Sequence, residues 1–245
     1  MNTDKNTVLQ QLRVRENIYF ILSGCTRMPF VLCDPETYDD EVFIFFEKDD
    51  ADREAKKLNE EAQPVQVIKI ENKNFLAFYS GLYPMGVNCM FVNCGTENEI
   101  KIQLEELVKK PEDQKLPDGV IRIENRPLHL TALYFMQELR RKQHKELTDT
   151  LKELQEEMMT HYSEATLIIA MREDKGIVIM KNKEGHVFLP VFTDIQEFRK
   201  FQMVNAKEKF GTGMIKAEKI RENLPPEAVG ILINPLSVNV PLKIR

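Results

Sequence analysis

The chain has 245 residues and a mass of 28.6 kDa, which suffices for one large domain or for two of ordinary size. Hydrophobic residues make up 42% of it and charged residues 30%, a balance that supplies a packed core and excludes wholesale disorder. No apolar run reaches the roughly 18 residues of a membrane span, and residues 1–10 lack the features of a signal peptide. We therefore expect a cytoplasmic protein without a membrane partner.

The two halves of the chain differ in charge. Residues 1–124 carry a net charge of −8 and residues 125–245 one of +3. Ordinary solvated surfaces account for this difference as well as docking faces do, because salt screens exposed charges. The overall charge of −5 and the pI of about 5.6 argue against nucleic-acid binding, which requires a basic surface.

The first half alternates short apolar runs with turn residues. Such runs, rich in aromatic and β-branched side chains, are typical of strands. We predict five strands, at 17–23, 28–33, 41–46, 65–70 and 87–92, with a turn-rich stretch at 34–40. The acidic residues Asp49, Asp50 and Asp52 suit the first turn of a helix that runs to Leu58, and a shorter helix is expected at 75–79.

The second half repeats this order of elements. Strands are expected at 166–172, 176–181, 186–192, 210–215 and 229–233, with helices at 194–201 and 216–223. The ends of the two halves match at an offset of 141, which aligns Pro84 with Pro225, Met90 with Ile231, Val92 with Ile233 and Asn93 with Asn234. This indicates an internal duplication, although two unrelated units could share so simple an element order.

The stretch between the halves, 126–162, contains no glycine and a single proline, Pro127. Four apolar residues at helical spacing form a stripe along it, namely Leu147, Leu151, Leu154 and Met158. We predict one long helix here, whose stripe packs within the chain. The alternative is a seam that pairs with a second copy in a homodimer.

At 186–235 the sequence resembles a known family. The run VFLPVFTDIQEFRKF, followed by a helix and then AVGILINPLS, is similar to the N-terminal domain of the enhanced serine sensitivity protein B (SseB) family, over about residues 164–241. The first half resembles that pattern only faintly, with EVFIFFEKDDADREAKKL in the corresponding place. The resemblance implies a small α/β domain whose biochemistry is undefined, and it supplies no catalytic residues.

Pro190 and Asn234 have structural interpretations. Pro190 interrupts a strong strand, which predicts an edge position or a bulge because proline cannot donate to a ladder. Asn234 precedes Pro235, so we expect an extended backbone there and a side chain that turns back to the end of the strand.

Few residues of the chain are candidates for metal binding or nucleophilic catalysis. The four cysteines, Cys25, Cys33, Cys89 and Cys94, lack the spacing of a zinc site, and we expect them to be reduced and buried. Cys25 adjoins Arg27, which could lower the thiol pKa, but Met28 and Pro29 follow in place of the glycines that a thiolate loop requires. We expect no metal and no organic cofactor.

The sequence therefore predicts an α+β protein of two similar α/β units, each with a mixed β-sheet and covering helices. The units are 1–124, a divergent copy, and 163–245, joined by a helix at 125–162. The predicted function is a non-catalytic interaction or regulatory module whose partner is a protein. The alternative is an enzyme whose site is assembled at the interface between the two units. Five residues are candidates for a partner or ligand face: Asp194, Asn234, Asn93, Cys25 and Arg27.

Overall fold

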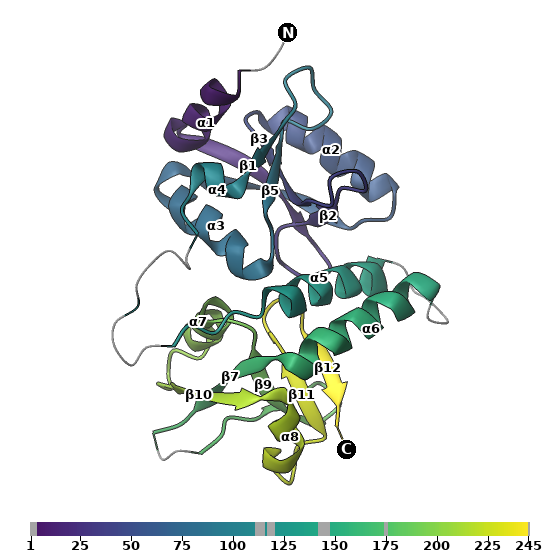
Figure 1. The fold of residues 1–245 in the computed structure, drawn as a ribbon, viewed down its shortest axis with the longest axis vertical. Coiled ribbons are helices and arrows are strands. Elements are labelled where there is room, and N and C mark those ends of the chain that lie inside the picture. Colours follow the sequence, from purple (N-terminus) through teal and green to yellow (C-terminus); the bar gives the residue numbers. More distant parts are fainter. Residues whose placement is uncertain (1–3, 111–115, 117–120, 142–147, 174–175, 245) are drawn as a thin grey trace. The chain divides into compact units, whose positions relative to one another are not determined.

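The computed structural model describes residues 4–110, 116, 121–141, 148–173 and 176–244 (Figure 1). The chain divides into two compact units, which we call unit 1 (Met1–Asp118 with Gln137–Gln143) and unit 2 (Gly119–Met136 with His144–Arg245). No described helix is both long and apolar enough to cross a membrane.

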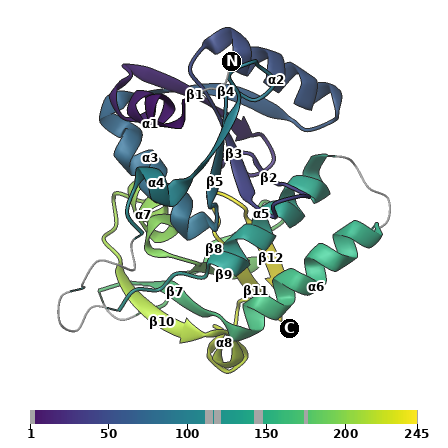
Figure 2. The same cartoon turned by 45° about the horizontal axis from the view of Figure 1, so that its top comes forward.

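Unit 1 contains one six-stranded mixed sheet with helices on both faces. Its elements are α1 (Lys5–Val14), β1 (Asn17–Ser23), β2 (Val31–Cys33), β3 (Asp40–Phe45), α2 (Lys48–Glu60), β4 (Val65–Glu71), α3 (Phe75–Leu82), β5 (Cys89–Val92), β6 (Ile100–Gln103) and α4 (Leu104–Leu107). The strand order is β4-β1-β3-β5-β6, with β2 paired to β3. Strands β3 and β5 run parallel and side by side (Figure 2), whereas the other pairs are antiparallel.

Unit 2 repeats this arrangement. Its elements are the first part of α5 (Arg126–Arg141), α6 (Asp149–Glu164), β7 (Thr166–Met171), β8 (Met180–Lys181), β9 (Val187–Phe192), α7 (Ile195–Val204), β10 (Gly211–Lys216), α8 (Ala217–Asn223), β11 (Gly230–Ile233) and β12 (Val240–Lys243). The strand order is β10-β7-β9-β11-β12, with β8 paired to β9, and the parallel pair is again the third with the fourth strand. The predicted fold of two similar α/β units with mixed sheets is therefore confirmed.

Alternation along the strands places aromatic side chains against helices on each face. In unit 1, Phe45 and Ile21 pack with Ala51, Ala55 and Leu58 of α2. The ring of Phe20 points to the opposite face, where it lies 4.9 Å from that of Phe78 in α3. Figure 1 accordingly shows α2 on one side of this sheet and α1 and α3 on the other. In unit 2, the face of Phe192 is covered by Phe198 and Phe201 of α7.

Each sheet has one more strand than the sequence predicted. Strands β6 and β12 were not predicted because each has only four residues, and β12 also contains a proline, which disfavours a strand. Helix α1 was also not predicted, although its buried residues Val8 and Leu12 lie four apart.

The prediction of one long connecting helix is wrong, because the chain forms two helices. Thr148 has an extended backbone and its hydroxyl oxygen accepts a hydrogen bond from the Leu151 amide, so it caps the start of α6. Leu151 and Met158 are buried within the chain and Leu154 is half-buried, whereas Leu147 lies outside the described residues. The buried part of the stripe thus supports packing within the chain over a homodimer seam.

The prediction of an edge position or a bulge at Pro190 is wrong, since β9 is paired on both sides and its register with β11 is unbroken at this residue. The carbonyls of Val187 and Val191 accept hydrogen bonds from residues that flank β11. Because backbone groups of successive residues point to opposite sides of a strand, the Pro190 nitrogen points away from β11, towards β7 and β8. There the pairing with β8 covers 187–188 and that with β7 covers 191–192. Proline falls in the gap between them and costs no ladder bond.

Candidate functional site

The connection between β2 and β3, residues 34–39, carries an exposed aromatic side chain. We call this connection the hairpin tip. Tyr38 is 77% exposed, the highest value among the large hydrophobic side chains that the structure describes. Its φ of 58° lies in the left-handed region, which is sterically unfavourable for a bulky L-residue. The fold therefore holds an aromatic ring in solvent at an energetic cost.

The equivalent turn of unit 2 avoids this cost. There Asn182 donates its amide to the His186 carbonyl, as Asp34 does to Asp39 in unit 1, and the residue before the acceptor is Gly185, with φ of 86°. Glycine adopts this conformation without a steric penalty. The turn of unit 2 is one residue shorter, and it has glycine at the left-handed position before its closing residue, where unit 1 has Tyr38.

Polar contacts from the neighbouring strands hold the hairpin tip in place. The Asp34 carboxylate accepts hydrogen bonds from two amides within the turn and forms an ion pair with Lys101 of β6. The carboxylate of Asp39 accepts from the Asn88 side chain at 2.7 Å and from that of Gln103 at 2.9 Å. The tip is thus anchored to residues beside β5 and in β6.

A buried carboxylate lies beneath these contacts. Glu41, Cys89 and Gln103 are in register across β3, β5 and β6, so their side chains share one face of the sheet. Glu41 is 3% exposed and its Oε1 lies 2.8 Å from the ammonium of Lys101. Burial, and then the charge of Asp39, raise the pKa of Glu41 to about 7, against the opposing effect of a hydrogen bond with the Cys89 thiol.

Asp39, Glu41 and Cys89 have the donor types of a metal site, with ligand atoms within 4.8 Å of one another. The surrounding contacts do not fit one. Both oxygens of Asp39 take amide donors, and the ammonium of Lys101 already supplies positive charge to Glu41. Burial and the charge of Glu41 also raise the pKa of Cys89 to about 12, whereas a metal ligand must be a thiolate. We assign this cluster to anchoring the hairpin tip.

The positions of unit 2 that match this cluster, all of them described, carry different residue types. The register of its sheet places Phe188, Gly230 and Pro241 where unit 1 has Glu41, Cys89 and Lys101. The anchored, acidic hairpin tip is therefore a property of unit 1 and not of the shared fold.

The main polar network of unit 2 is enclosed. Nδ1 of His129 lies 3.1 Å from Asp194 Oδ2, and the Thr193 hydroxyl donates to the same oxygen at 2.8 Å. Burial alone would raise the pKa of Asp194, but the hydrogen bond and charge of His129 lower it overall. His129 and Asp194 are each 1% exposed, and Nε2 of His129 has no hydrogen-bond partner among the described residues.

Asp194, a predicted site residue, is the N-cap of α7. Its Oδ1 accepts from the amides of Gln196 and Glu197. The side chain of Asn234, another predicted site residue, donates to the Thr193 hydroxyl that contacts Asp194. The structure thus joins these two residues in one buried network instead of an exposed face.

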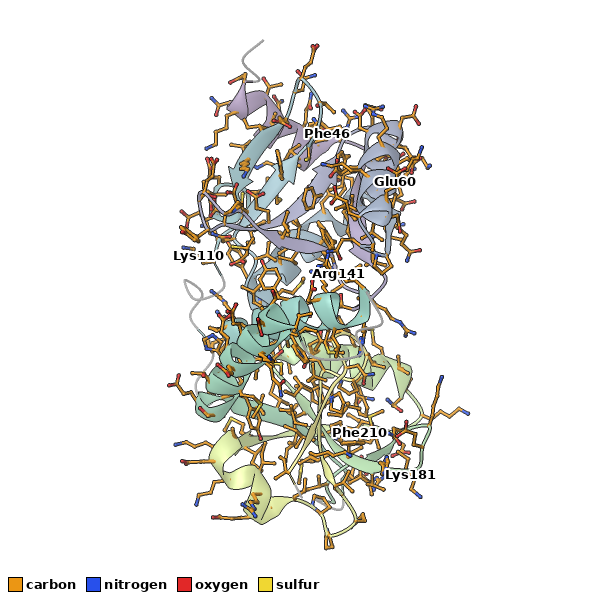
Figure 3. All side chains as sticks on the ribbon, turned by 90° about the vertical axis from the view of Figure 1, so that its right-hand side faces the viewer. Phe46, Glu60, Lys110, Arg141, Lys181 and Phe210 are labelled. Atoms are coloured by element: carbon orange, nitrogen blue, oxygen red, sulfur yellow. The ribbon has the colours of Figure 1, made fainter. Side chains whose placement is uncertain are left out.

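Asn93 and Asn234 have matching structural roles. Both have positive φ, 52° and 44°, and the side-chain oxygen of each accepts a backbone amide 3.0 Å away, from Phe46 (labelled in Figure 3) and Thr193 respectively. The prediction that the Asn234 side chain turns back to a strand end is confirmed. The extended backbone predicted for this residue is wrong, because its φ lies in the left-handed region. Asparagine tolerates the left-handed region, which explains its presence at both positions.

Cys25 and Arg27 share a turn of unit 1, apart from Asp194 and Asn234 in unit 2. Cys25 is buried, which raises its thiol pKa against the opposing charge of Arg140. Arg27 is exposed with φ of 59°. Cys33 is exposed and Cys94 is half-buried, so the prediction of four buried cysteines is correct only for Cys25 and Cys89. Tyr38 was missed as a site residue because no sequence pattern predicts its backbone conformation.

No protein-family model and no curated protein sequence matches the chain. Among solved structures, it is similar to Tic22 from Plasmodium falciparum, with 13% identity over 87% of this chain and 84% of that one and a TM-score of 0.23. It is also similar to Anabaena Tic22, described as a protein of protein transport, with 10% identity over 93% and 92% and a TM-score of 0.23. Scores this low carry no argument about this chain. The resemblance to the SseB family stays a prediction.

Proposed function

We propose that the chain is a non-catalytic protein-binding module and that the hairpin tip of unit 1 contacts the partner. The observation that carries this proposal is Tyr38, an exposed aromatic side chain held in a left-handed conformation where the duplicate unit has glycine. Residues in such sparsely populated conformations cluster at functional sites, where the surrounding structure holds them in place.

Tyrosine is well suited to this role. It offers a large amphipathic surface at a low cost in conformational entropy, and it is among the residues that dominate binding energy at interfaces. The ion pair of Asp34 and the amide contacts of Asp39 fix the tip before binding, which reduces the ordering cost on association. Leu32, which is 46% exposed, adds apolar surface in β2, the strand that leads into the tip.

The charge around Tyr38 favours a basic partner surface. Four acidic residues that are not buried lie within seven positions of the chain, Asp34, Glu36, Asp39 and Asp40, and Lys101 forms an ion pair with Asp34. A lysine or arginine of the partner would gain both from these carboxylates and from the face of the Tyr38 ring.

The enclosed state of the ionisable groups supports binding over catalysis. Glu41, Cys89, His129 and Asp194 are each at most 3% exposed. A substrate could reach them only if the surrounding structure opened. Tyr38, in contrast, is accessible in the folded protein.

The test is site-specific photocrosslinking in an extract of the native host. A photoreactive phenylalanine analogue at position 38 is compared with the same analogue at Leu76, which is 70% exposed on α3 of the same unit. We expect discrete adducts from position 38 that excess unlabelled wild-type protein removes and excess Tyr38→Gly protein does not. Equal competition by the two proteins would show that the hairpin tip is not the binding site.

A further inference from the structure

Strand β10 is an edge strand of the sheet of unit 2, with its backbone open to pairing. All six of its residues pair in unbroken register with β7, and no described strand lies on its other side. The Ala217 amide donates to the Ala165 carbonyl at 2.9 Å, which continues the same ladder. Because antiparallel residues alternate in the direction of their bonds, Thr212, Met214 and Lys216 turn their backbone groups outward.

The equivalent edge of unit 1 is guarded by charge. Tyr19 pairs with Lys69 and with Phe45, as Ile168 pairs with Met214 and with Phe192, so Lys69 and Met214 occupy equivalent positions. A lysine in an edge strand is a common device against pairing with another chain. Unit 2 has in its place a methionine that is 56% exposed.

Both edges close their first outward position in the same way. The Asn59 side chain bonds the amide and carbonyl of Val65 at the start of β4. The Gln202 side chain accepts the amide of Phe210, directly before β10 (Phe210 is labelled in Figure 3). The difference between the two edges therefore begins after this position, at the residues of β10 itself.

The remaining guards seen in natural sheets are also missing from β10. It contains no proline and no bulge, and its one charged residue, Lys216, stands at its end. Strand β12, at the other edge of the same sheet, contains Pro241 and ends at Lys243. Of the two edges of unit 2, β10 is thus the one fit for strand addition.

We propose that β10 pairs antiparallel with β10 of a second copy of this chain, with Met214 on the two-fold axis. This interface lies in unit 2 and goes beyond the function proposed for unit 1. Pairing Met214 with Met214 sets Thr212 opposite Lys216 of the second copy, so every outward residue meets another outward residue. No like charges face each other in this register. The outward amides of each copy meet the outward carbonyls of the other, and both copies use the same strand, as a two-fold symmetric dimer requires.

Apolar side chains beside the edge favour a second copy as the occupant. Met214 lies directly opposite Ile168, so its side chain is on the sheet face that α7 covers. On α7, Met203 and Val204 are each 70% exposed. A two-fold axis normal to the sheet would place the exposed Met214 side chains of both copies next to each other on this face, which adds apolar contact to the backbone bonds.

The first test is sedimentation equilibrium of the full chain over a range of concentrations. Met214→Pro removes an outward amide that β7 does not use, so the sheet should persist while the dimer dissociation constant rises at least about tenfold. Met214→Thr keeps the amide and suits a strand, and should stay dimeric. A wild-type chain that is monomeric throughout, or equal association of the two variants, would overturn the proposal.

Crosslinking fixes the register independently. In a Cys33→Ser background, Met214→Cys places two thiols across the axis, with Cα atoms about 5.5 Å apart, within reach of a short bis-maleimide. We expect covalent dimers from Met214→Cys. Thr212→Cys should form them only when Lys216→Cys is added. Dimers without this pattern would place the interface elsewhere, including at the α6 stripe, and would refute pairing through β10.

Discussion

Replacing Tyr38 separates the cost of its backbone conformation from the value of its side chain. The left-handed conformation of a non-glycine residue lowers the stability by about 1 to 2 kcal/mol, and Tyr38→Gly removes this cost. Glycine also makes the unfolded chain more flexible, which cancels about 0.4 to 1 kcal/mol of that gain. With 77% of the side chain exposed, only about 50 Å² is buried, worth about 1 kcal/mol. We therefore expect Tyr38→Gly to change the stability of unit 1 by less than about 1 kcal/mol.

Tyr38→Ala is the matched control, since it loses the same ring but keeps the strain. It should be about 1 kcal/mol less stable than Tyr38→Gly. Urea denaturation followed by circular dichroism measures the difference, with hydrogen exchange of the β3 amides assigning the transition to unit 1. If Tyr38→Gly were the less stable of the two, Tyr38 would be unstrained and the reasoning about its function would fail.

Three further predictions test the interior of each unit. Asn234→Ala leaves the buried Thr193 amide unpaired and puts alanine at positive φ, so denaturation should show a loss of about 2 to 4 kcal/mol, with a milder loss for Asn234→Gly. Leu151→Ala should cost about 2 to 5 kcal/mol and Leu154→Ala clearly less, because the first side chain is fully buried and the second half-buried; similar melting temperatures would contradict this. The pKa of Glu41 is about 7 in the folded protein against 4.5 for a free side chain. At a pH between these two values, Glu41 is protonated in the folded protein and ionised in the unfolded chain. The free energy of unfolding of wild type relative to Glu41→Gln should therefore fall as pH rises from about 5 to about 7 and level off above. An NMR titration that places the pKa of the Glu41 carboxyl near 4.5 would contradict this prediction.

Repetition along the chain made the fold predictable. The short apolar runs at 17–23 and 166–171 and the acidic start of α2 are local signals that the structure bears out. Asn93 and Asn234 aligned because the same turn needs a residue that tolerates positive φ and can bond a strand end. Strands β6 and β12 are too short for a local pattern to predict them. The place of Pro190 depends on how β9 pairs with its neighbours, which no local pattern shows.

The candidate site could not be predicted in the same way. Glu41, Cys89 and Lys101 are far apart in sequence, and the register of three strands brings them together. The significance of Tyr38 depends on its φ and on the glycine at the equivalent position of unit 2. The acidic run at 34–41 was visible, but as a turn, since composition alone does not distinguish an anchored tip from a solvated loop.

The central claim, that Tyr38 is the main contact of a protein-binding site, is tested most directly by calorimetry. The partner recovered by crosslinking at position 38 is titrated with wild type, Tyr38→Phe and Tyr38→Gly, all with intact circular dichroism. The proposed function predicts near wild-type affinity for Tyr38→Phe and, for Tyr38→Gly, a dissociation constant raised at least about thirtyfold, as expected of a residue that dominates an interface. Equal affinities for wild type and Tyr38→Gly would contradict it.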